Sequence, residues 1–150
     1  MKASLVLFVL VLAIYSSYAY EKFVYHNGDE ILRQLQKMDG KTYLLFFFKN
    51  PGTNRDLRTT NDYFKDRIRA EVLEPKDAPA TPYVYAEVDA TDLYGNGYLV
   101  DRLKVSRDGL NEWPTIVLMK DGKGNVIRGP TAIHSVKESL KALAAPPQNS

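Results

Sequence analysis

Apolar residues occur along the chain at two spacings, and each spacing predicts one type of element. Residues 42–48 form an unbroken apolar run rich in aromatics, which is typical of a central strand covered on both faces. Shorter apolar runs predict further strands at 23–25, 83–88, 115–119 and 125–128. Apolar residues at helical spacing predict helices at about 31–38, 57–73, 92–105 and 133–144.

Several local details follow from the same pattern. Asn27 or Asp29 is expected to cap the first helix, and Gly40 is expected to end it. Met38 is expected on the inner face of that helix, and Tyr63 on the inner face of the second helix. Four further tyrosines form either an exposed contact surface or the lining of a strand and a short helix: Tyr83, Tyr85, Tyr94 and Tyr98.

The predicted elements follow one another in the order β-α-β-α-β-α-β-β-α, which places the chain in the α/β class. Helices between strands imply right-handed crossovers and parallel pairing in a central sheet flanked by helices. The turn at 121–124 is expected to close a hairpin, which would add one antiparallel strand at the edge of a mixed sheet.

The first nineteen residues are typical of a secretory signal peptide. Lys2 precedes an apolar run at 5–14, and small residues at Ser17 and Ala19 favour cleavage after Ala19. The run is short for a membrane span, although an uncleaved anchor is the alternative. We therefore expect a signal peptide at 1–19, one domain at 20–145 and a disordered tail at 146–150. No membrane contact is expected after cleavage. The tail is not a KDEL-type retention signal.

Composition excludes several classes of function. The chain of 150 residues has no cysteine, which removes disulfide scaffolds, thiol nucleophiles, iron–sulfur clusters and cysteine zinc sites. It has only two histidines, so a metal site built from histidines is not expected. No cofactor is expected either. Its 20 basic residues nearly cancel its 18 acidic ones without a basic block, which disfavours nucleic-acid binding.

The order of elements and three segments resemble the thioredoxin fold as it occurs in the protein disulfide isomerase family. Residues 44–48 resemble its central strand, Trp113-Pro114-Thr115 resembles its cis-proline position, and Asp121-Gly122 lies at its usual turn. A closer resemblance is to the redox-inactive ERp29 N-terminal domain, through 85–88, 92–96, 103–105, 113–114 and 120–122.

Two departures from the ERp29 pattern limit what the resemblance implies. The resemblance covers only about residues 21–144, so the helical domain that follows in that family is not expected here. The family's Tyr-Pro-Tyr-Gly loop reads Asn50-Pro51-Gly52-Thr53 here, so peptide binding through those tyrosines is not carried over.

The resemblance also implies that the site lacks redox chemistry. Redox-active relatives have two cysteines where the loop after the central strand meets the next helix, and those places fall near Pro51 and Asn54. Their buried acid on the central strand corresponds to about Leu45. We therefore expect no disulfide exchange and no enzyme activity. A glutathione-dependent enzyme is the remaining catalytic alternative, with Thr53 as the nearby hydroxyl.

The binding geometry of the fold is expected to persist without the chemistry. A cis-proline at Pro114 would present backbone groups beside the loop to an extended peptide, with Trp113 as an apolar anchor. The alternative is that Trp113 packs into the core and Pro114 shapes a turn. The candidate partner-binding residues are Asn50, Pro51, Thr53, Asn54, Trp113 and Pro114.

The resemblance implies a chaperone or escort that binds secretory proteins or peptides. The expected location is the endoplasmic reticulum lumen or the extracellular space. The alternative is a secreted structural or interaction protein that uses the same scaffold without chaperone activity. A homodimer is left open, because residues 21–30 do not clearly match the corresponding segment of the family.

Overall fold

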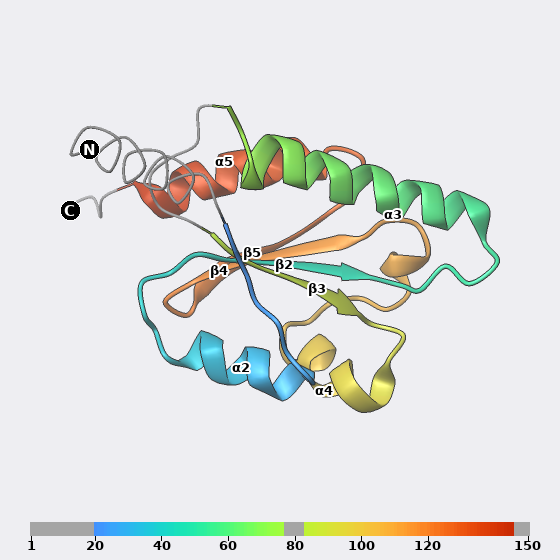
Figure 1. Cartoon of the computed structure of the whole chain (residues 1–150), viewed down its shortest axis with the longest axis horizontal. Coiled ribbons are helices and arrows are strands. Elements are labelled where there is room, and N and C mark those ends of the chain that lie inside the picture. Colours follow the sequence, from blue (N-terminus) through green and yellow to red (C-terminus); the bar gives the residue numbers. More distant parts are fainter. Residues whose placement is uncertain (1–19, 77–82, 146–150) are drawn as a thin grey trace, which may run out of the picture.

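The structure is a computed structural model that describes residues 20–76 and 83–145. The expected signal peptide at 1–19 and the expected tail at 146–150 lie outside the described residues. The described part forms one five-stranded sheet with helices on both faces (Figure 1).

The sheet is mixed, and its strand order is β1-β3-β2-β4-β5. Its central strand β2 pairs in parallel with β3 and antiparallel with β4. The short strand β1 extends the sheet in parallel beyond β3, and β5 pairs antiparallel with β4. The strands are β1 (Glu21–Lys22), β2 (Tyr43–Phe48), β3 (Val84–Asp89), β4 (Thr115–Lys120) and β5 (Lys123–Arg128).

The predicted order of elements is confirmed, but the expected parallel direction of β4 is wrong. The short helix α4 (Leu93–Arg102) begins just after β3, at the end of the sheet where β2 and β3 both finish. The segment after α4 returns to that same end of the sheet, where Thr115 pairs with Phe47 near the end of β2. A strand that starts where its neighbour ends must run the opposite way.

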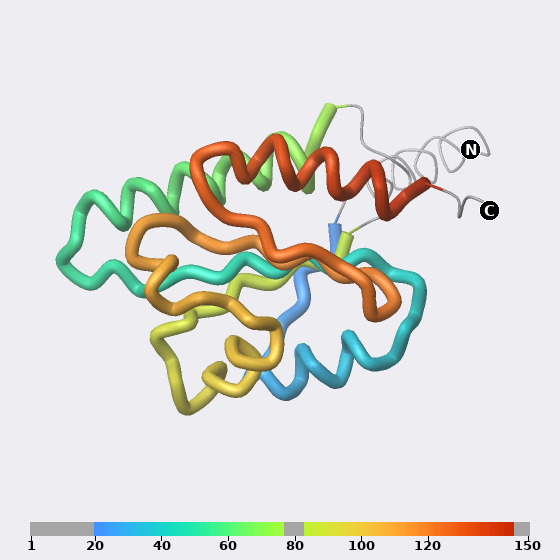
Figure 2. The backbone as a smooth tube through the Cα atoms, turned by 180° about the vertical axis from the view of Figure 1, so that it is seen from behind, coloured from blue at the N-terminus to red at the C-terminus, as the bar shows by residue number. Residues whose placement is uncertain are grey.

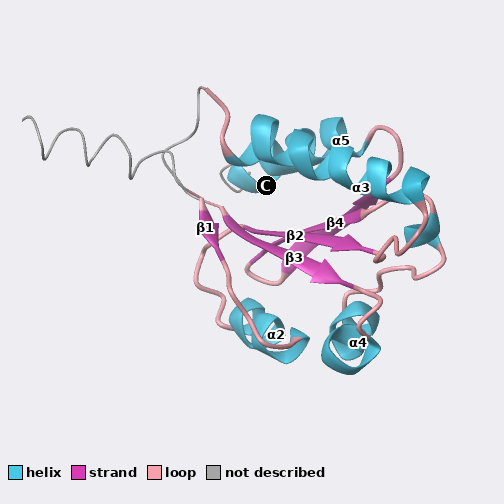
Figure 3. Cartoon of the chain, turned by 45° about the vertical axis from the view of Figure 1, so that its right-hand side comes forward, coloured by secondary structure: helices cyan, strands magenta, loops and turns pink. Residues whose placement is uncertain are grey.

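Two pairs of helices cover the two faces of the sheet (Figure 3). One face carries α3 (Arg55–Ile68), which continues as a π-helical turn at Arg69–Leu73, together with α5 (Ala132–Ala144). The other face carries α2 (Gly28–Gln36) and α4, with a 3₁₀ turn at Gly109–Asn111.

The aromatic run of β2 lies at the centre of both cores. Phe46 packs with α3 and α5, whereas Phe47 packs on the face of α2 and α4, because successive strand residues point to opposite faces. Both side chains are 0% exposed, which confirms a central strand that is covered on each side.

Several local predictions about β1 and α2 are corrected. Pairing in β1 occurs two residues earlier than predicted, after which Phe23 donates its N–H to Tyr85 and the chain leaves the sheet. Asn27 is the cap of α2, as one of the two alternatives predicted. The helix ends before Met38, which adopts a positive φ of 48° and is 62% exposed rather than inward.

Two tyrosines differ in their exposure. Tyr63 points outward from α3, so its expected position on the inner face is wrong. Tyr85 is buried in the core that α3 and α5 cover, which fits the alternative that the tyrosines line a strand. Across residues 20–76 and 83–145, no helix combines the length and apolarity needed to cross a membrane.

Candidate functional site

The candidate residues of the Asn50–Asn54 loop lie after the end of β2, and the loop is held by a set of local hydrogen bonds. The N–H of Asn50 donates to the Thr91 hydroxyl beyond β3 at 2.8 Å, and the N–H of Gly52 donates to the Asn50 side-chain oxygen at 3.0 Å. The Arg58 guanidinium donates to the Gly52 carbonyl at 2.6 Å. The side-chain oxygen of Asn50 therefore serves the loop itself.

Asn54 caps α3. Its side-chain oxygen accepts the N–H of Leu57 at 3.0 Å, and its own N–H donates to the Pro51 carbonyl at 2.8 Å. Asn54 thus stands at the helix start where redox-active relatives are expected to carry a thiol, and its amide stabilises the free N–H groups of the helix. Pro51 is half-buried, and Thr53 is exposed.

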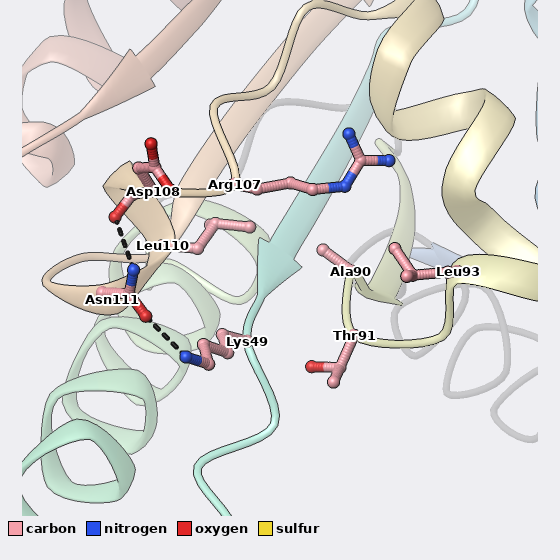
Figure 4. Close-up of a pocket in the computed structure, with 8 residues that line it drawn as sticks. All are labelled: Lys49, Ala90, Thr91, Leu93, Arg107, Asp108, Leu110 and Asn111. Atoms are coloured by element: carbon pink, nitrogen blue, oxygen red, sulfur yellow. Dashed lines mark hydrogen bonds between the residues drawn. The ribbon is translucent and has the colours of Figure 1, made fainter.

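A polar contact joins the end of β2 to the segment before Trp113. The Lys49 ammonium donates to the side-chain oxygen of Asn111 at 2.5 Å, as Figure 4 shows. The buried Asn61 of α3 donates its side-chain N–H to the Lys49 carbonyl at 3.0 Å. These three residues hold the end of β2 in place. Local sequence pattern does not reveal them, because their partners lie 12 to 62 residues away along the chain.

Trp113 and Pro114 behave differently from each other. The peptide bond before Pro114 is trans, so of the two alternatives left open at this position the cis-proline is not found, and the Pro114 ring is buried at the start of β4. Trp113 is half-buried and packs edge-to-face on Phe64, with ring centroids 5.8 Å apart. Pro114 fits the alternative that it shapes the chain, whereas Trp113 combines core packing with a partly accessible ring.

The accessible side of Trp113 lines a shallow groove of about 340 Å³. The groove lies between α3 and the loop that follows β5, and its lining consists of Thr59, Thr60, Tyr63, Phe64, Trp113 and Pro130. The Tyr63 ring is 52% exposed, and its hydroxyl accepts a hydrogen bond from the Arg67 guanidinium at 2.8 Å. That bond orients the ring at the mouth of the groove.

Arg67 is itself fixed by an ion-pair network. Its guanidinium contacts the Glu71 carboxylate, which also accepts a hydrogen bond from the Lys137 ammonium of α5 at 2.6 Å. The two cations, Arg67 foremost, lower the pKa of Glu71 to about 2, so this carboxylate stays ionised at neutral pH. The network ties α3 to α5 beside Tyr63.

A second pocket of about 250 Å³ lies at the end of the sheet where β2 and β3 finish, on the side of α4. Figure 4 shows that Lys49 and Arg107 flank it, with the Arg107 side chain directed toward α4, where it contacts Asp101 and the Gly97 carbonyl. Its apolar lining consists of Ala90, Leu93 and Leu110.

The structure therefore divides the predicted set of site residues between neighbouring features. Of the six, only Trp113 lines one of these two pockets. The other five form the loop, the helix cap and the start of β4 around it. The described residues hold no group of three or more histidine, aspartate or glutamate side chains placed to bind a metal ion.

Comparisons with known proteins bear on the fold. Neither a protein-family model nor a curated protein sequence matches the chain. Among solved structures, thioredoxin f from spinach chloroplast (short form) matches with a TM-score of 0.57 and 12% identity, covering 86% of this chain and 96% of that one. Reduced Schistosoma mansoni thioredoxin matches with a TM-score of 0.52 and 16% identity, covering 83% and 99%. At these identities the likeness concerns architecture alone, and the chain has a thioredoxin-like fold.

Proposed function

We propose that the chain is a redox-inactive thioredoxin-like protein of the secretory pathway, which binds proteins or peptides as a chaperone or escort of the ERp29 type. The observation that carries the proposal is the groove at Trp113, which presents the rings of Tyr63 and Trp113. No thiol lies beside it, because the chain has no cysteine. The signal peptide expected at 1–19 supports the compartment.

The proposed lack of redox activity rests on the residues at the start of α3. Disulfide exchange needs a thiolate to attack, and the chain has no cysteine. Pro51 and Asn54 stand at the expected cysteine positions, and the Asn54 amide is used as a helix cap. Leu45, at the position expected for a buried acid, is an apolar core residue that is 1% exposed. We therefore infer that the chain is not an enzyme.

The proposed binding rests on aromatic rings that are already held in place. Trp113 is fixed by its packing on Phe64, and Tyr63 by its bond to Arg67. Ordered rings lose little conformational entropy when a ligand covers them, which favours affinity. Trp and Tyr are also the residues that most often dominate protein interfaces. The groove would take an apolar side chain of an extended segment, and the Asn50–Thr53 loop would flank that segment.

The experiment that tests the proposal uses a permanently unfolded protein as the probe. Reduced, carboxymethylated α-lactalbumin carrying a fluorescent label is titrated with residues 20–150 of the chain, and anisotropy reports binding. Tyr63→Ser should weaken binding about tenfold, the loss expected when one interface tyrosine is removed. Tyr98→Ser is the matched control, because Tyr98 is 62% exposed on α4, on the other face of the sheet.

Two results would overturn the proposal. One is no change in anisotropy for the unmodified protein at any accessible concentration. The other is equal loss of binding in the two variants, which would place the contact outside the groove.

A further inference from the structure

The outer edge of β5 is an open strand edge. β5 is the last strand of the sheet, and it pairs with β4 on one side only. In Figure 2, β5 lies on the side of the molecule that faces the viewer. Val126, near the middle of β5, is 49% exposed. No backbone group of the described loops and helices donates to, or accepts from, the residues of β5.

The hairpin turn sets which residues of β5 face outward. Asp121 and Gly122 form a two-residue turn with φ values of 49° and 78°, so Lys120 and Lys123 are the closing pair. Residues of an antiparallel pair alternate between bonding to the partner strand and facing away from it. The backbone N–H and C=O groups of Gly124, Val126 and Arg128 therefore point away from β4.

The opposite edge of the sheet is shorter, because its edge strand β1 has only two residues, whereas β5 has six. There, β1 covers the start of β3, and Phe23 donates to the Tyr85 carbonyl. Further along β3, the Tyr25 hydroxyl donates to the Glu87 carbonyl at 2.5 Å. Burial is the main cause that raises the pKa of Tyr25 to about 12, and nearby carboxylates add to it. The Tyr25 hydroxyl therefore keeps its proton at neutral pH.

The hairpin carries uncompensated positive charge. None of the salt bridges between described side chains involves Lys120, Lys123 or Arg128. Lys120 lies directly opposite Lys123, and like charges at such a pair destabilise a sheet. The one carboxylate of the hairpin, Asp121, accepts the N–H of Gly40 at 2.9 Å. The hairpin thus carries three cations and one carboxylate.

We infer that the outer edge of β5 accepts an acidic, extended segment of a partner protein as a sixth strand of the sheet. Outward backbone groups would bond to the added strand, and its carboxylates would relieve the Lys120–Lys123 repulsion. A second copy of the chain is a poor occupant, because edge-to-edge pairing would bring two such cationic hairpins to one strand spacing. The inference is independent of the groove at Trp113.

Amide hydrogen exchange tests the inference with two matched peptides as probes. The acidic probe is acetyl-Thr-Glu-Val-Thr-Val-Glu-Thr-amide, and the control probe has lysine in place of both glutamates. The acidic probe should slow exchange at Gly124, Val126 and Arg128, and should bind about tenfold more tightly than the control at low salt. Added salt should narrow that difference.

A proline variant separates strand addition from simple charge attraction. Val126→Pro removes an outward N–H and no bond to β4, so the hairpin should keep its fold. The Val126→Pro variant should no longer bind the acidic probe, and it should still bind unfolded α-lactalbumin.

Three results would overturn the inference. The first is no protection at the three outward amides. The second is equal affinity for the two probes or unchanged probe binding by the proline variant. The third is a dimer, seen by sedimentation, that protects the same amides without any probe.

Discussion

Asn54→Ala separates two roles for Asn54, which the sequence predicts to be a partner-binding residue. The structure assigns the Asn54 side chain to capping, because its oxygen accepts the Leu57 N–H at 3.0 Å at the start of α3. If this is its main role, the variant should lose stability and keep its affinity for an unfolded probe. A ligand contact would give the opposite result.

The expected loss of stability follows from the cap geometry. Replacing an asparagine cap by alanine costs about 1 kcal/mol, because a free N–H of the first turn loses its acceptor. For a domain of about 130 residues, this corresponds to a fall of about 4 °C in melting temperature. Asn54→Asp keeps an acceptor oxygen and places a negative charge at the helix start, so it should be at least as stable as the unmodified chain.

Urea unfolding followed by circular dichroism measures the difference, and thermal melting checks it. Asn50→Ala is the control, because the Asn50 oxygen bonds only within the exposed loop, to Gly52, and its removal should cost about 0.5 kcal/mol or less. The assignment of Asn54 to capping would be refuted by an alanine variant of unchanged stability. It would also be refuted if aspartate were as damaging as alanine.

The remaining predictions concern the network beside the groove, the packing of α2, the hairpin and the redox chemistry. Glu71→Gln should lower the free energy of unfolding by about 1 kcal/mol at pH 7, allowing for the partial exposure of its partners. The pKa of Glu71 is lower in the folded state than its ordinary value of 4.5, so the stability that Glu71 contributes should be present above pH 4.5 and lost as the pH falls toward 2. Urea titrations of the variant and the unmodified protein should therefore converge near pH 2. Gly28→Ala should destabilise by about 1–3 kcal/mol, because a Cβ on Gly28 would lie 2.7 Å from the Cβ of Leu99; an unchanged melting temperature would show that α2 and α4 are not tightly packed. Lys123→Thr should raise stability by a few tenths of a kcal/mol in the absence of a partner, because it removes the like-charge pair of the hairpin, and a salt-independent effect would argue against that cause. Insulin disulfides incubated with the protein and dithiothreitol should be reduced at the rate of dithiothreitol alone, and any acceleration would contradict the redox-inactive assignment.

The local pattern of the sequence was enough to predict most elements of the fold. The run at 42–48 became the central strand β2, because aromatic residues on both faces require cover on both faces. The apolar spacing of 57–73 predicted the helix that ends in a π-helical turn. Asn27 and Asp29 were the two predicted caps of α2, because short polar side chains favour that position, and Asn27 is the one that caps the helix.

Features that depend on distant contacts could not be predicted from local pattern. The direction of β4 depends on where the segment after α4 returns to the sheet, and spacing does not record that. Tyr85 is buried because α3 and α5 cover its side of β3. The trans bond before Pro114 and the link between Lys49 and Asn111 are likewise set by tertiary context. The predicted set of site residues thus combines Trp113, which lines a groove, with five residues that form the loop, the helix cap and the start of β4.

The single tryptophan of the chain gives the most direct test of the proposed binding surface. Trp113 emission is recorded while carboxymethylated α-lactalbumin, with its own tryptophans replaced by phenylalanine, is added to the protein at constant concentration. Covering the half-exposed ring should shift its emission to shorter wavelength and saturate together with the anisotropy change. An anisotropy change without any response from Trp113 would show that unfolded chains bind elsewhere, and would contradict the account.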